Sequence, residues 1–175
     1  MQDVPDRLTL KRHRDLDGVS TVPWPRRIIL SLIALLSILG LLNAFGQRPQ
    51  TTIASAPAAH LKLYAPAHLR GGLLFSARFH VYADRDIKNA FIILDPGWVE
   101  GMSVNTIEPS PLGQASSNGR LTLQLGHIPK GDSYILWLEL QVNPTNVAWR
   151  RPANVTLADG KTVILTIHHH FTTYP

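Results

Sequence analysis

The sequence contains no cysteine among its 175 residues. This absence excludes disulfide bonds, thiol nucleophiles, cysteine-zinc sites and lipid anchors on cysteine. Because small secreted domains of eukaryotes often depend on disulfides, an exported domain without them is more typical of bacteria.

The sequence also lacks the motifs of common catalytic sites. The run from Gly101 to Asn105 has a serine at its centre but lacks the second glycine of a nucleophile elbow. The carboxylates of Glu100, Glu108 and Glu139 have no spacing that pairs them as acid and base. No glycine-rich phosphate loop is present. We therefore expect a protein that is not an enzyme and has no cofactor.

Positive charge is in excess, but it is concentrated near the N-terminus. Residues 1–48 contain seven Lys or Arg against four acids, whereas the rest contains ten against eight. The later basic residues are scattered and form no stripe along the sequence. The charge is therefore better explained by membrane topology than by nucleic-acid binding, and we expect no nucleic-acid partner.

One long apolar run, Ile28 to Phe45, has neither charge nor proline over eighteen residues. As a helix it spans about 27 Å, close to the thickness of a bilayer core. Arg26 and Arg27 precede it, and Trp24 lies where an interfacial aromatic residue is expected. The run predicts a transmembrane helix over 28–46; a retained signal anchor is favoured over a cleaved signal peptide.

The basic flank lies on the N-terminal side of this run. The positive-inside bias therefore predicts a cytoplasmic, disordered tail over 1–27 and an extracytoplasmic C-terminal part. Residues 47–59 have short side chains and two prolines, which predicts a stalk. The folded domain is expected over 60–175, in a single-pass protein of the cell membrane.

After residue 60 the helical spacing of apolar residues ends, and apolar and polar residues begin to alternate. Leu136, Leu138, Leu140 and Val142, for example, share one face of a predicted strand. An Asp159-Gly160 pair indicates a hairpin turn. The chain is thus predicted to be mostly β, an antiparallel immunoglobulin-like β-sandwich of about seven strands. The predicted strands cover residues 61–64, 73–82, 91–94, 120–125, 134–142, 155–157 and 162–168.

About 50 residues carry a resemblance to a known class of domain. The stretch LTLQLGHIPKGDSYILWLELQVNP, followed by NVTLADGKTVILTI, resembles the second half of bacterial extracytoplasmic immunoglobulin-like sandwich domains. The shared features are a strand, a G-x-[IL]-x-x-G turn at Gly126–Gly131, a long apolar strand and an Asp-Gly hairpin. The resemblance implies a binding or structural module, with Trp137 in a core role.

The predicted contact surface combines two segments rich in aromatic and charged residues. One is the irregular segment from Trp98 to Pro111, which includes Glu100 and Glu108; the other is Trp149-Arg150-Arg151. Aromatic residues and arginine are enriched in protein interfaces. The alternatives are a crossover loop for the first segment and a core position for Trp149. We hypothesise a non-enzymatic envelope protein that contacts the bilayer and another membrane or envelope protein, and that can form homo-oligomers.

A second hypothesis is a membrane-tethered metal or small-ligand binder that uses the C-terminal histidines. His168 and His170 share one face of a strand, while His169 points the other way. Two ligands do not complete a metal site, so His80 or His127 would have to supply a third.

Overall fold

The computed structural model describes residues 23–42 and 47–175. The chain divides into two compact units, 1–45 and 46–175, and each is described by itself. Residues 1–22 of the tail predicted over 1–27, and residues 43–46 at the end of the predicted membrane span, lie outside the described residues.

The first unit contains the helix α1, Pro23–Leu41. It begins five residues before the predicted apolar run, so that Trp24, Arg26 and Arg27 lie inside the helix rather than before it. A proline is tolerated in the first turn because the N–H it lacks would have no partner there. Within α1, the 18-residue segment Trp24–Leu41 has a mean hydropathy of 1.6. By length and composition, this segment is long and apolar enough to cross a membrane.

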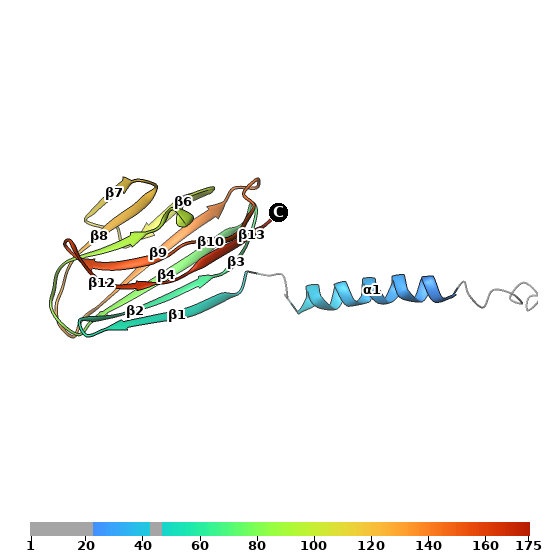
Figure 1. Ribbon diagram of the computed structural model, residues 1–175, viewed down its shortest axis with the longest axis horizontal. Helices are drawn as coiled ribbons and strands as arrows, with labels where there is room; N and C mark the ends of the chain where they lie inside the picture. The colour runs from blue at the N-terminus through green and yellow to red at the C-terminus, as the bar shows by residue number, and fades with distance from the viewer. Residues whose placement is uncertain (1–22, 43–46) are drawn as a thin grey trace, which may run out of the picture. The chain divides into compact units, whose positions relative to one another are not determined.

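The second unit is a sandwich of antiparallel sheets with a smaller sheet at one end (Figure 1). One five-stranded sheet has the order β1-β2-β4-β9-β6. Its strands are β1 (Pro49–Ala56), β2 (Ala59–Pro66), β4 (Leu74–Ala83), β9 (Ser133–Val142) and β6 (Met102–Glu108).

The facing five-stranded sheet has the order β12-β11-β5-β8-β7. Its strands are β12 (Thr162–Ile167), β11 (Val155–Asp159), β5 (Ile87–Leu94), β8 (Arg120–Ile128) and β7 (Gly113–Ser117). A short 3-10 helix, η2 (Pro96–Trp98), follows β5.

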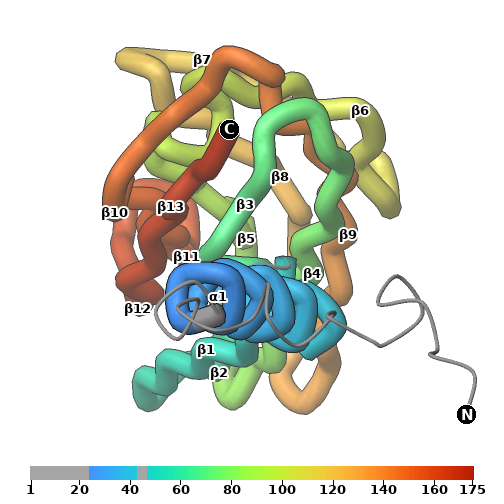
Figure 2. The backbone as a smooth tube through the Cα atoms, turned by 90° about the vertical axis from the view of Figure 1, so that its right-hand side faces the viewer, coloured from blue at the N-terminus to red at the C-terminus, as the bar shows by residue number. Residues whose placement is uncertain are grey.

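The three-stranded sheet has the order β10-β13-β3. Its strands are β10 (Ala148–Pro152), β13 (His170–Tyr174) and β3 (His68–Arg70). The pair β13–β3 is parallel, and the two strands lie side by side in Figure 2.

The predicted β-sandwich is confirmed, but the predicted number of strands is wrong: there are thirteen in the described residues, not about seven. Each of the seven predicted runs overlaps a strand, and the Asp159-Gly160 hairpin joins β11 to β12. The missed strands are short or polar, and such strands show little alternation. They are β1, β3, β6, β7, β10 and β13.

The segment predicted as a stalk, 47–59, differs most from expectation. Its residues 49–56 form β1, which pairs with β2 along its whole length, from Pro49 opposite Pro66 to Ala56 opposite Ala59. Thr52, Ala54 and Ala56 are half-buried. Short side chains and two prolines indicated a semi-extended stalk, but short side chains also suit an edge strand that contributes mainly backbone hydrogen bonds.

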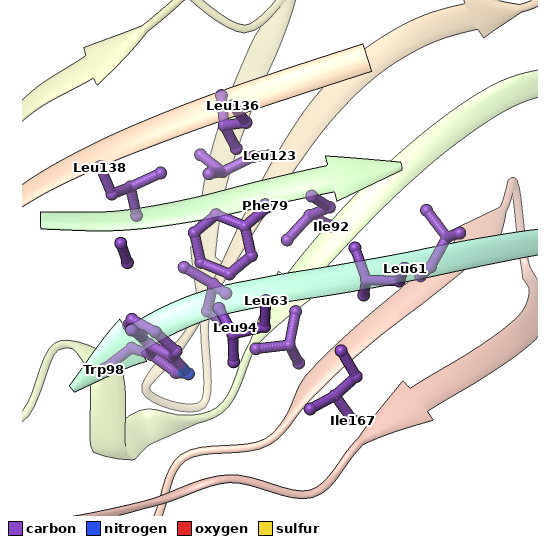
Figure 3. Close-up of a cluster of buried hydrophobic side chains, with 14 of the residues drawn as sticks. Leu61, Leu63, Phe79, Ile92, Leu94, Trp98, Leu123, Leu136, Leu138 and Ile167 are labelled. Atoms are coloured by element: carbon purple, nitrogen blue, oxygen red, sulfur yellow. The ribbon is translucent and has the colours of Figure 1, made fainter. Parts of the chain in front are cut away.

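The core lies between the two five-stranded sheets. Leu61, Leu63 and Phe79 of one sheet meet Ile92 and Leu94 of the other (Figure 3). The predicted inward set of β9 is buried as expected, and the alternating Phe75, Ala77, Phe79 and Val81 of β4 are buried in the same way. All buried core residues of the described chain lie between Ala59 and Phe171, so the second unit contains its own core and is expected to fold by itself.

Candidate functional site

The outer face of the β1-β2-β4-β9-β6 sheet carries one row of side chains across all five strands. The strand registers place Thr51 opposite Tyr64, Tyr64 opposite Arg78, Arg78 opposite Trp137, and Trp137 opposite Glu108. Side chains directly opposite on antiparallel strands are close enough to interact. The row therefore brings together residues from positions 51 to 137.

Three residues of this row, Tyr64, Arg78 and Trp137, form a stack that we call the ladder. The guanidinium carbon of Arg78 lies 5.2 Å from the centre of the Tyr64 ring and 4.9 Å from that of the Trp137 ring. Each such cation–π contact is worth about 0.5–1 kcal/mol at an exposed site. Trp137 is 44% exposed, so the ladder holds a large aromatic ring in a fixed position at the surface.

An open groove of about 340 Å³ lies beside the ladder. Trp137 and the side chains of Glu108 and Glu139 line it, and Thr106 Oγ1 is 3.5 Å from Glu139 Oε2. The groove thus combines an aromatic ring with two carboxylates. This combination suits a cationic side chain, which can contact the ring and pair with a carboxylate.

The predicted core role of Trp137 is wrong. Trp137 alternates with Leu136 and Leu138, which were predicted to face the core, so the same alternation places Trp137 on the outer face. The outward position of Trp137 could therefore have been predicted from the sequence. Its contact with Tyr64 and Arg78 could not, because that contact depends on the register of three strands.

Trp98, which was predicted to contact a partner, is fully buried. It lies in η2, its Nε1 donates a hydrogen bond to the carbonyl of Ala153 at 2.8 Å, and its ring contacts Phe79 and Phe171. The segment Trp98–Pro111 is not a loop either, because most of it forms η2 and β6. The residues Asp95-Pro96-Gly97 are typical of a turn, and the η2 turn that forms there directs the indole into the core.

The other predicted contact residues are separated. Trp149 is 77% exposed, which contradicts its alternative interpretation as a core residue. The exposed Arg150 lies beside it in β10, while Arg151 Nη1 donates to the backbone carbonyl of Glu100 at 2.6 Å. Glu108 instead lines the groove beside Trp137, on the β1-β2-β4-β9-β6 sheet. The structure therefore divides the predicted surface in two.

The C-terminal histidines do not form a cluster with His127 that could bind a metal ion. His168 and His170 are exposed, but His168 Nδ1 contacts Asn154 at 3.3 Å, and His127 pairs with Asp86 at 2.7 Å. Within residues 23–42 and 47–175, no group of three His, Asp or Glu side chains is placed to hold a metal ion.

His169 is buried against the rings of Trp98 and Phe171. Its Nε2 lies 3.3 Å from the carbonyl oxygen of Pro66. The pKa of His169 is lowered to about 4, mainly by burial; the contact with Pro66 opposes this shift, and the neighbouring His170 adds to it. His169 is therefore a neutral core residue at neutral pH.

No protein-family model matches the sequence, and no curated protein matches it. Among solved structures, the chain is similar to a non-cellulosomal cohesin from the hyperthermophilic archaeon Archaeoglobus fulgidus, with 15% identity, a TM-score of 0.41, and coverage of 73% of this chain and 92% of that chain. It is also similar to the major pilin subunit of Bacillus cereus, with 11% identity, a TM-score of 0.42, and coverage of 72% and 40%. Similarity at this level assigns no function.

Proposed function

We propose that the protein is a single-pass membrane protein of the bacterial envelope whose sandwich is a non-enzymatic binding module. The ladder and its groove are the contact surface, and the partner is another membrane or envelope protein. The Tyr64–Arg78–Trp137 stack, whose Trp137 ring is exposed beside two carboxylates, carries this proposal. The apolar helix Trp24–Leu41 supports the membrane anchor.

The ladder has the properties of a binding hot spot. Tryptophan, tyrosine and arginine dominate the energy of protein interfaces. Because Arg78 already holds the Trp137 ring, a partner loses little side-chain entropy when it packs against that ring. Glu108 and Glu139 favour a partner segment that presents lysine or arginine.

Site-specific photocrosslinking in intact cells tests the proposal. A photoreactive amino acid replaces Ile135, which is exposed on β9 two residues from Trp137. We expect a discrete adduct with one envelope protein, and the adduct should disappear in the Trp137→Ala and Glu108→Lys backgrounds. The matched control places the same amino acid at Val163, an exposed residue of the opposite sheet.

The result that contradicts the proposal is an adduct equally strong at Ile135 and Val163, or one unchanged by Trp137→Ala. Circular dichroism of each variant provides the control for folding. Because Trp137 and Glu108 are exposed, their substitution should leave the β-sheet signal unchanged.

A further inference from the structure

One end of the sandwich combines exposed apolar side chains with an excess of arginine. We call it the entry end, because β1 begins there with Pro49 opposite Pro66. Hydrogen bonds join the segments that meet at this end: Gly71 N donates to Tyr174 O at 2.8 Å, and Gly72 N donates to Val142 O at 2.9 Å. Ala148, at the start of β10, lies opposite Thr173.

The apolar side chains of the entry end are large and exposed. Trp149 and Val147 are 77% and 63% exposed, and Leu73 and Tyr174 are also exposed. Tyr174 stacks on His68, with ring centres 6.1 Å apart, which fixes the orientation of its ring. Tryptophan and tyrosine are the residues enriched where proteins meet the headgroup region of a bilayer.

The charges of the two ends differ. The described residues at the entry end include five arginines against two carboxylates, and both carboxylates lie beside arginines: Asp95 by Arg120 at 3.2 Å, and Glu100 by Arg151 at 3.9 Å. The opposite end, at the turns beside Ala59 and Ala83, is balanced. The charged residues at this opposite end are four acids and four bases: Asp84, Asp86, Asp132 and Asp159 against Arg85, Lys88, Lys130 and Lys161. At the entry end, the arginines besides Arg120 and Arg151 are Arg48, Arg70 and Arg150.

We infer that the entry end binds an anionic lipid surface, with Trp149 and Val147 in the headgroup region and Arg70 and Arg150 near lipid phosphates. The length of the chain permits this contact. Seven peptide steps separate Leu41, the last residue of α1, from Arg48, and they span at most about 25 Å. The inference rests on the proposed membrane anchor and adds that the lipid surface is itself a ligand of the sandwich.

Vesicle binding by the isolated second unit, residues 46–175, tests the inference without the anchor. We expect it to sediment with vesicles of phosphatidylcholine and phosphatidylglycerol, but not with vesicles of phosphatidylcholine alone. Arg70→Gln and Arg150→Gln should each lower the partition coefficient about fivefold, and Trp149→Ala should lower it as well. Matched controls are Arg85→Gln at the opposite end and Trp137→Ala on the outer face, which should bind as the unsubstituted unit does.

A second measurement uses the full chain in nanodiscs. Since the chain has no cysteine, Val147→Cys and Lys161→Cys each provide a single labelling site at opposite ends of the sandwich. An environment-sensitive dye at 147 should shift to the blue and be quenched by brominated lipid, while the same dye at 161 should not. Equal spectra at both sites, or vesicle binding that does not depend on anionic lipid, would overturn the inference while leaving the crosslinking test of the ladder unaffected.

Discussion

The four tryptophans have different environments, and a different consequence is expected from replacing each of them. Trp98 is enclosed by Phe79, Phe171 and His169, and its indole N–H is bonded to Ala153. Trp137 and Trp149 are exposed on separate surfaces, and Trp24 lies in the helix. Substitution of Trp98 should therefore affect stability, whereas substitution of Trp137 or Trp149 should affect binding.

Trp98→Ala is predicted to lower the free energy of unfolding of residues 46–175 by about 3–5 kcal/mol, because it removes a large buried side chain and leaves a cavity. Trp98→Phe should cost less, but it leaves the carbonyl of Ala153 without its indole partner, at a cost of about 1–3 kcal/mol. Urea unfolding followed by circular dichroism measures both effects. Trp149→Ala is the control and should change the free energy of unfolding by less than about 0.5 kcal/mol.

His169 is predicted to make stability depend on pH. Its pKa is about 4 when folded against 6.5 for an ordinary histidine, so the unfolded chain binds more protons between these values. This contribution to stability is therefore fully present above about pH 6.5 and is lost progressively as the pH falls from 6.5 to about 4. The loss attributable to His169 amounts to about 2 kcal/mol between pH 7 and pH 5.

His169→Phe provides the comparison, since it keeps a ring against Trp98 and Phe171 but removes the titrating group. Urea unfolding of both proteins at the two pH values gives the difference. An identical pH dependence for the two proteins would show that His169 does not keep a depressed pKa in the folded state.

At the scale of elements, alternation predicted the central strands and failed at the edges. The runs around Phe79 and Leu138 alternate strictly because one face is buried and the other meets solvent. β1 and β7 contain mainly Thr, Ser, Ala and Gln, whose small side chains show no contrast between faces. Their membership of a sheet depends on backbone pairing with a neighbour distant in sequence, which periodicity does not record.

Deleting β1 should destabilise the sandwich. A fragment that begins at residue 58 lacks the strand that pairs with β2, so it leaves the hydrogen-bonding edge of β2 without a partner. We predict that this fragment unfolds at a lower urea concentration than residues 46–175, or aggregates. A stalk would have no such effect, so equal unfolding midpoints would restore the stalk interpretation.

A point substitution separates the backbone of β1 from its side chains. Ile53 is exposed on the outer face of β1, opposite Lys62. Ile53→Ser should therefore leave the midpoint nearly unchanged, although the deletion lowers it. This comparison shows whether β1 acts through backbone pairing rather than through its largest side chain.

At the scale of the whole molecule, the residues predicted to form one contact surface lie on two separate surfaces of the same unit. The groove beside Trp137 is lined by carboxylates, while the entry end around Trp149 is rich in arginine. Opposite charge at two surfaces allows a cationic protein segment and an anionic lipid surface to be bound without competition. Trp137→Ala should therefore abolish the crosslink to the partner protein and preserve lipid binding, whereas Trp149→Ala should weaken lipid binding and preserve the crosslink.

The orientation of the chain in the membrane is the last prediction, and it follows from Arg26 and Arg27 at the N-terminal side of the apolar helix. Protease added to spheroplasts should remove a C-terminal tag, while an N-terminal tag should stay protected until detergent is added. Extraction with alkaline carbonate should leave the full chain in the membrane and release residues 46–175 when these are exported alone. A C-terminal tag protected in intact spheroplasts would place the sandwich in the cytoplasm, where its ladder would face a different set of proteins.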